Sequence, residues 1–424
     1  MSSNARRLRS CSRRLSRDLS GSVAIASAFM FPLIIGSVGL GVETGYWYVS
    51  QRQLQHVADV SAHAGALRKK AGDSATAYTE AARYLASKSG FAGPSSAILV
   101  NTPPSTGAFT AKTDAVEVII SENLPRYFTS FFTRDPLTIE ARAVARVDGN
   151  PTCVLALATT GSGAFHVGGS TELNLPTCDI VSNSTHANSF QMQGAAARIT
   201  AACVYSAGGV SANSNLGLEV CEAAEENAAP VADPYADVTQ PAVTGVCANG
   251  NVSNTTLTPT EAHASGVSSK RFCSGLSISG AVHLDPGLYI IGGGNLSGSN
   301  GATLTGSGVT LFFTNGARVS LSNSTTQTLS APTSGPFSGI LMFGDRNDPN
   351  LSHTARGSGS SSYQGAIYFP AGHMDYRGNS ASTNGCTQLI AKTIDFGGNS
   401  SFSSSCDAAG TRSIRAGRYI TVVE

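Results

Sequence analysis

An uncharged apolar segment near the start of the chain limits what the rest of the protein can be. Residues 22–42 carry no charged side chain, and a helix needs about 20 apolar residues to cross a bilayer. Residues 1–20 hold six arginines and a single acid, Asp18. Because positively charged flanks stay in the cytoplasm, we predict a basic cytoplasmic tail at 1–20 and a transmembrane helix at 21–43. The bulk of the chain would then be periplasmic.

Two other interpretations of this segment fit less well. A cleaved signal peptide would need a shorter apolar core and a small-residue cleavage site, whereas this run continues into Glu43 and the aromatic residues 46–48. Aromatic side chains of that kind favour the headgroup region of a membrane. A helix buried in a soluble domain would leave the preceding arginines without a role. The pattern therefore favours a retained single-pass anchor in the inner membrane.

The remainder of the chain has few charges. Charged residues make up 13% of the sequence, against about 25% in typical soluble domains, and serine, threonine, asparagine and glycine take their place. The net charge is +1, and much of the positive charge lies in the tail. No basic patch with interleaved aromatic residues remains in the body, which argues against nucleic acid as a partner.

The cysteines indicate disulfide bonds outside the cytoplasm. Cys11 lies in the tail, and the other eight cysteines follow residue 150. An even number in an exported region favours disulfides, with free buried thiols as the alternative. No CxxC pair or paired Cys/His spacing indicates zinc, and we expect no cofactor. Pairing of neighbours along the chain predicts Cys153–Cys178, Cys203–Cys221, Cys247–Cys273 and Cys386–Cys406.

The anchor helix is expected to continue beyond the membrane. Residues 51–67 contain no proline, and apolar side chains recur there near helical spacing. A stripe of small residues runs along this helix, formed by Ala58, Ala62, Gly65 and Ala66. It could pack closely against a helix of another protein or against the chain's own domain, and the sequence leaves both open. A second helix is predicted at 74–87.

Short strands complete a small α+β domain at 44–150. Alternating apolar residues predict strands at 98–100, 115–120 and 137–147. Between the last two strands, residues 124–132 have an apolar aromatic face that suits a helix. The turn residues 148–151 mark the domain boundary.

Residues 18–67 carry a pattern known from one protein family. A small-residue entry at Gly21 precedes the apolar segment, Glu43 stands near its exit, and an alanine-rich helix follows. The pattern on that helix is formed by Leu54, Gln55, Ala58, Asp59 and Ala62. This segment resembles the TadG-like and TadE-like proteins of the Flp (tight adherence) pilus-assembly system.

The resemblance implies a membrane-anchored, non-catalytic component of Flp-type pilus assembly that acts as a scaffold or anchor and supports adhesion. It implies pseudopilins or other pilus-assembly proteins as partners, and the small-residue stripe would then dock a pseudopilin. The sequence departs from the family at Glu43, usually Asp, and at Val57 and His63, usually alanines. Related pilins are cut after a glycine with a glutamate five residues on. Here Ala26 stands at that spacing from Gly21, so we expect the anchor to stay uncut.

Residues 151–424 consist of short apolar bursts between turns of Gly, Ser, Asn and Thr, without a helical pattern. Bursts such as 287–291 and 309–313 recur irregularly at roughly 20 to 25 residues, the range of repeat units. Stacked coils can be short because each strand pairs with the next coil. We therefore predict a right-handed parallel β-helix (solenoid), with a β-sandwich as the alternative. The acidic, alanine- and proline-rich residues 222–245 predict an excursion along its side.

The solenoid raises the question of an enzyme, because many solenoids cleave polysaccharides. The polar candidates are Asp345, Asp348, His353, His373, Asp375, Arg377 and Asp395. Two carboxylates can flank a glycosidic bond, and the oxygen-rich residues 345–350 suit calcium. The simpler interpretation is a polar loop at 345–350 and an exposed ion pair on the strand 373–377.

The remaining catalytic motifs are missing from the sequence. It has no nucleophile elbow, no P-loop and no dinucleotide-binding glycine motif before a helix. We therefore predict no enzyme, with no catalytic, metal or cofactor residues. The alternatives are an envelope adhesin or scaffold that binds an envelope glycan, and a membrane-tethered polysaccharide lyase or hydrolase.

Overall fold

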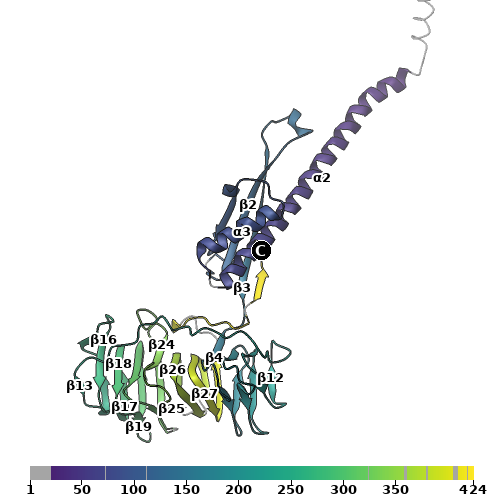
Figure 1. Cartoon of the computed structure of the whole chain (residues 1–424). Helices are drawn as coiled ribbons and strands as arrows, with labels where there is room; N and C mark the ends of the chain where they lie inside the picture. Colours follow the sequence, from purple (N-terminus) through teal and green to yellow (C-terminus); the bar gives the residue numbers. More distant parts are fainter. Residues whose placement is uncertain are drawn as a thin grey trace, which may run out of the picture. The chain divides into compact units, whose positions relative to one another are not determined.

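The computed structural model describes residues 21–71, 73–110, 112–322, 324–357, 361–378, 381–403, 409–417 and 419–424. The chain forms two compact units (Figure 1). Unit 1 comprises residues 1–148 and 419–424, and unit 2 comprises residues 149–418. The predicted cytoplasmic tail, with Cys11, lies outside the described residues.

Among the described residues, unit 1 contains two α-helices. Helix α2 (Gly21–Lys70) runs without a break from the apolar segment into the predicted extramembrane helix. Helix α3 (Ala75–Lys88) begins at Ser74, whose side chain accepts a hydrogen bond from the Ala77 N–H, a standard N-cap. It ends just before Gly90, whose positive φ of 103° suits glycine. The predicted helix at 74–87 thus matches α3 within one residue at each end.

The sheet of unit 1 is antiparallel and has the order β1-β2-β3-β29. A 3-10 turn η1 (Ser95–Ala97) leads into β1, and the strands are β1 (Ile98–Asn101), β2 (Ala115–Leu124), β3 (Leu137–Asp148) and β29 (Tyr419–Val422). The last strand is the exception to the predicted division at residue 150. It pairs with β3, from Tyr419 opposite Asp148 to Val422 opposite Ala145, and so satisfies a strand edge that would otherwise stay open.

The prediction of a helix at 124–132 is wrong. Leu124 still belongs to β2, and the only helical turn is the 3-10 turn η2 (Thr129–Phe131). The backbone N–H groups of Tyr127 and Thr129 donate to the Glu43 carboxylate. A carboxylate therefore organises this segment in place of helical hydrogen bonds.

Unit 2 is a parallel β-solenoid of about 10 turns. Its strands pair in parallel from coil to coil, apart from the short antiparallel pair of β15 (Glu261–Ala262) with β16. This overturns the β-sandwich alternative, whose sheets would be antiparallel. The right-handed winding stays a prediction.

Strand pairing divides the coils into three faces. The first face contains β13 (Cys247–Ala248), β16 (Ser268–Phe272), β18 (Gly287–Gly292), β21 (Val309–Thr314), β24 (Ile340–Gly344), β4 (Thr152–Ala156), β7 (Asp179–Ser182) and β10 (Val204–Ser206). The second contains β19 (Leu296–Gly298), β22 (Val319–Ser320), β25 (Ser352–Gly357), β5 (Phe165–Val167), β8 (Phe190–Met192) and β11 (Val210–Ser211). The third contains β20 (Thr303–Gly306), β23 (Thr326–Ser330), β28 (Asn399–Ser403), β6 (Glu172–Leu175), β9 (Arg198–Ala201) and β12 (Leu216–Leu218). Four long strands turn corners between faces: β14 (Asn251–Leu257), β17 (Leu276–Leu284), β26 (Ser362–Gly378) and β27 (Ala381–Gly397).

The chain enters this solenoid in the middle and not at an end. Strand β4 pairs with β7 on one side and with β27 on the other. From β4 the coils run outward to β10, and from β13 they run back inward to β27. The order of coils in space therefore differs from the order in the sequence.

The predicted excursion at 222–245 connects the two distant ends. Along its length it bonds to successive coils: Val231 exchanges hydrogen bonds with Asn183, Tyr235 contacts Gln388, and Gln240 contacts Asp345. At its far end the Ala242 carbonyl lies 2.9 Å from Nε2 of His263. It thus lies against the side of the coils.

Disulfide bonds join neighbouring coils. The structure pairs Cys153 with Cys178, Cys203 with Cys221 and Cys247 with Cys273, at sequence separations of 25, 18 and 26. These are the first three pairs that neighbour pairing predicts, because one coil brings residues about that far apart into register. Cys386 is disulfide-bonded, and its predicted partner Cys406 lies outside the described residues.

Candidate functional site

The first part of helix α2 has the surface of a membrane span. None of the residues 23–42 is buried, and large apolar side chains such as Phe29 and Leu33 are each 72% exposed. Among the described helices, α2 is long and apolar enough to cross a membrane. So much exposed apolar surface is stable only if something apolar covers it. The segment fits a single-pass membrane anchor.

The second part of α2 is packed into its own domain. Leu54, Ala58 and Ala62 are at most 2% exposed and belong to the apolar core formed with the sheet. At Gly65, an added Cβ would lie 3.0 Å from Cγ1 of Val116 in β2. The small-residue stripe therefore lets the sheet and α3 approach the helix closely. The stripe is covered by unit 1 itself, which favours packing against the chain's own domain over packing against a helix of another protein.

Glu43 stands at the change from exposed to buried helix. It is 2% exposed, although Val42 and Thr44 beside it are exposed. Its carboxylate oxygens accept hydrogen bonds from the backbone N–H groups of Tyr127 and Thr129, both at 2.7 Å. Hydrogen bonds to an ionised acceptor are short and strong. Glu43 therefore fixes the connection between β2 and β3 to the helix where the apolar segment ends.

The Phe128 ring, next to the two residues that Glu43 binds, contacts the apolar segment itself. Phe128 lies against Gly39, where a Cβ atom would overlap the ring. Tyr127 makes an edge-to-face contact with Tyr46, with ring centroids 5.7 Å apart. The connection between β2 and β3 therefore touches the helix on both sides of Glu43.

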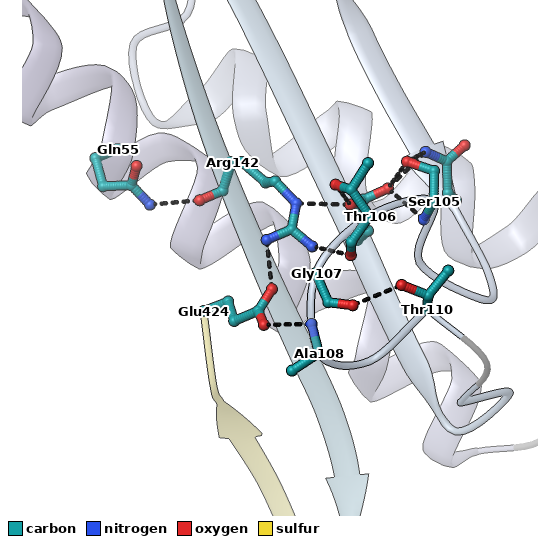
Figure 2. A network of polar contacts seen from close by, with 10 residues as sticks. Gln55, Ser105, Thr106, Gly107, Ala108, Thr110, Arg142 and Glu424 are labelled. Carbon is teal, nitrogen blue, oxygen red and sulfur yellow. Dashed lines mark hydrogen bonds and ion pairs between the residues drawn. The ribbon is translucent and has the colours of Figure 1, made fainter.

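Farther along the helix, a polar network joins α2, the sheet and the last strand. Nε2 of Gln55 donates to the Arg142 carbonyl in β3 and to Oδ1 of Asp59, each at 2.8 Å. The Arg142 guanidinium lies between Glu117 and Glu424 and also donates to the Thr106 carbonyl at 2.6 Å. Figure 2 shows Arg142 at the centre of these contacts.

Glu117 is the buried anion of this network. Its side chain is fully buried. Burial alone would raise its pKa, but hydrogen bonds from Ser105 and Asn101, with that of Arg142, lower the pKa to about 2. The pKa of Glu424 is also lowered, first by the hydrogen bond of Arg142 and then by the Ala108 N–H. Both carboxylates are therefore ionised at neutral pH and hold Arg142 in place.

These positions assign structural roles to the residues that carry the family pattern. Gly21 begins α2, Glu43 binds the β2–β3 connection, and Gln55 bridges to β3 and Asp59. Leu54, Ala58 and Ala62 are core residues. None of these contacts needs a ligand, so the pattern describes how a long apolar helix is joined to a sheet.

Comparison with known proteins agrees with this geometry. Residues 21–68 match the Tad family. The matching family description reads "Putative Flp pilus-assembly TadE/G-like". The matched range, here called the Tad region, covers the apolar segment and the packed half of α2, and it supports a role in Flp pilus assembly. No curated protein and no solved structure was found to match the chain.

The polar residues weighed for catalysis do not form a common site. Asp345 accepts hydrogen bonds from Gln240 and Thr314, Asp348 accepts one from the Gly316 N–H, and His353 is buried. Burial lowers the pKa of His353 to about 3, so it stays neutral. Each of these groups is engaged in local structure.

Two carboxylates of this set do share a face. Asp375 and Asp395 stand opposite each other on β26 and β27. Each has a basic partner: Arg377 Nε lies 2.6 Å from Asp375, and His166 Nδ1 lies 2.8 Å from Asp395. The hydrogen bond that His166 donates to the Asp395 carboxylate raises the pKa of His166. Within the described part of the chain, no group of three His, Cys, Asp or Glu side chains could hold a metal ion.

Sequence reasoning missed the network around Arg142. Glu117 is the one charged residue in the apolar run 115–120, and Arg142 stands between Ala141 and Ala143. A charge in such a strand signals a buried partner. The partner of Arg142, Glu424, lies 282 residues away, and nothing in the local sequence indicates it.

Proposed function

We propose that this protein is a non-catalytic inner-membrane component of Flp pilus assembly, with its N-terminus in the cytoplasm and both folded units in the periplasm. The observation that carries this is the continuity of α2, whose exposed apolar half passes directly into a half buried in a sheet. A continuous helix of this kind holds the folded domain at a fixed distance from the membrane.

Three features support the periplasmic location. The arginines before the apolar segment favour a cytoplasmic N-terminus. The disulfide bonds of unit 2 need an oxidising compartment. The third feature is the stability of the solenoid outside the cell interior. Its coils are held by an apolar core and by disulfide bonds and depend little on charged residues, which are scarce in this chain. Such a body suits a scaffold that presents long surfaces to other proteins of the assembly or to envelope glycan.

Topology reporters test the orientation. A reporter that is active only in the periplasm, fused after Glu424, should be active, and one that is active only in the cytoplasm should not. The same pair fused after residue 20 should give the opposite pattern. Cytoplasmic activity after Glu424 would contradict the proposal.

Piliation tests the role. Removal of the gene should abolish or mislocalise pili, and the full chain should restore them. Normal pili in the deletion strain would contradict the proposed role in pilus assembly. A matched variant with an unrelated apolar span in place of 22–42 separates simple anchoring, which that span would restore, from recognition of partners within the membrane.

The pair of carboxylates on β26 and β27 keeps a tethered glycan-cleaving enzyme as the competing proposal. Joint replacement of Asp345, Asp348, His373 and Asp375 by alanine distinguishes the two. A scaffold should still support piliation after these changes. Loss of a glycan-cleaving activity present in the unaltered protein would favour the enzyme.

A further inference from the structure

The connection between β2 and β3 exposes a cluster of aromatic side chains. Tyr127 is 66% exposed, Phe131 89% and Phe132 75%. The rings of Phe131 and Phe132 pack edge to face with centroids 5.5 Å apart. Rings exposed to water in this way do not stabilise the fold. Exposed apolar patches are typical of surfaces that bind a protein, a membrane or a ligand. We call residues 127–132 the aromatic loop.

The contacts of the aromatic loop place it beside the membrane span. Phe128 packs on Gly39, inside the apolar segment, and Glu43 holds the N–H groups of Tyr127 and Thr129. At 1.5 Å per residue, Gly39 lies about 6 Å from Glu43 toward the middle of the span. The loop therefore reaches the depth at which the last turns of the span meet lipid.

Charged residues on either side of the loop complete an interfacial pattern. The Arg126 guanidinium lies over the Trp47 ring, 5.4 Å from its centroid, and Arg126 Nε donates to the Asp135 carbonyl at 2.7 Å. Arg134 is exposed on the other side of the loop. Aromatic rings prefer the membrane interface, and arginines beside them reach lipid phosphates.

We propose that the aromatic loop inserts Phe131 and Phe132 into the outer leaflet of the same bilayer that α2 crosses. This inference rests on the membrane anchoring in the proposed function. It gives unit 1 a second attachment to the bilayer besides α2. Two attachments fix the depth and tilt of unit 1, whereas a single helix would let unit 1 rotate and tilt relative to the membrane. The partner is lipid, because the loop is joined to the span itself through Gly39 and Glu43.

Quenching of tryptophan fluorescence by brominated lipids tests this. Trp47 is the only tryptophan in the sequence, so a full-length Trp47→Phe protein is a dark background. Phe131→Trp, Val38→Trp and Tyr84→Trp are then introduced separately, all at exposed positions. Each protein is reconstituted into vesicles of phosphatidylcholine and phosphatidylglycerol, with and without bromine on the acyl chains.

We expect blue-shifted emission and strong quenching at position 131 and also at position 38 in the span. Position 84, exposed on α3, should show neither. Quenching at 38 but not at 131 would overturn the loop insertion and leave the anchor standing. Absence of quenching at both positions would overturn the anchor and, with it, this inference. If a pilus protein covered the loop instead, position 131 would emit as position 84 does in these vesicles.

Discussion

Glu43 joins the apolar segment to the folded domain through its carboxylate. Its two hydrogen bonds go to the backbone N–H groups of Tyr127 and Thr129, which precede or begin the 3-10 turn η2 and have no partner within it.

Replacement of this carboxylate should free the loop. In Glu43→Ala, the N–H groups of Tyr127 and Thr129 lose their acceptor, so their amide hydrogens should exchange much faster. Glu43→Gln keeps an acceptor oxygen and should have a smaller effect. The control is Glu140→Ala, at an exposed position on β3, which should leave both amides protected. Equal exchange in Glu43→Ala and the unaltered protein would contradict the role assigned here.

Glu117 makes the stability of unit 1 depend on pH. Its pKa of about 2 in the folded protein lies below the ordinary 4.5. The carboxylate therefore stabilises the fold fully above about pH 4.5, and this contribution disappears as the pH falls from there toward 2. The shift corresponds to at most about 3 kcal/mol.

Amide exchange in β2 measures this effect. Protection of β2 should weaken between pH 6 and pH 3 after correction for the intrinsic exchange rate. Glu117→Gln should be less stable than the unaltered protein at pH 6 but should lose less on acidification. The prediction fails if both proteins lose protection equally between these two values.

The packed half of α2 shows why its surface is lined with small side chains. Ala62 is fully buried against the domain, whereas the neighbouring His63 is exposed. Ala62→Leu should therefore overpack the core and destabilise unit 1 by about 1–3 kcal/mol. His63→Leu, the control, should change stability by less than about 0.5 kcal/mol. Thermal unfolding followed by near-UV circular dichroism compares the two, and an unchanged Ala62→Leu protein would mean that the stripe is free.

The excursion is held to the solenoid by Arg346. Its guanidinium donates to the carbonyls of Tyr235 at 2.7 Å and Val238 at 2.8 Å, and it lies over the Phe343 ring. Tyr235 itself is fully buried. One side chain thus bonds two backbone groups of a segment that has no regular structure.

Loss of Arg346 should therefore loosen the excursion. In Arg346→Ala, chymotrypsin should cleave after Tyr235 faster than in the unaltered protein, because the ring must leave its site to reach the protease. Arg356→Ala, at an exposed position on β25, serves as the control and should be cleaved at the original rate. Equal rates for both variants would show that other contacts hold the segment.

Each folded unit of the molecule is built from parts of the chain that are distant in sequence. In the solenoid, β27 and β4 pair directly, although the paired residues Leu389 and Val154 are 235 positions apart in the sequence. In unit 1, β29 returns to β3 after the whole solenoid has been made. Unit 1 therefore combines residues that precede the solenoid in the sequence with residues that follow it.

Deletion of residues 419–424 should weaken unit 1 and leave the solenoid unchanged. It removes the pairing with β3, the hydrogen bond from the Val144 N–H to the Glu424 carbonyl and the Arg142–Glu424 ion pair. Amides of β3 should lose protection against hydrogen exchange, and those of β18 and β21 should not. Tyr419→Ala, which keeps the strand, should stay close to the unaltered protein. Undiminished protection in β3 after the deletion would contradict this dependence.

Structural features that depend on residues close together in the sequence could be predicted from it. The apolar segment, the continuation of α2, the helix α3 and the strands β1 to β3 depend on neighbouring residues, and all of them lie where periodicity places them. The three described disulfide pairs could be predicted for the same reason, since one coil separates their partners. The family resemblance likewise rests on a contiguous stretch, which the family match covers.

Only the tertiary structure decided the contacts between distant segments. The aromatic residues 124–132 have a helical pattern, but their backbone is bound by a carboxylate more than 80 residues earlier in the chain. The stripe at Ala58 and Ala62 suits an external or an internal partner equally, until the sheet is seen to cover it. Likewise, the order of the coils and the return of β29 follow from which strand edges meet in space. Periodicity records which side of an element is apolar, whereas the choice of its partner depends on the shape of the whole chain.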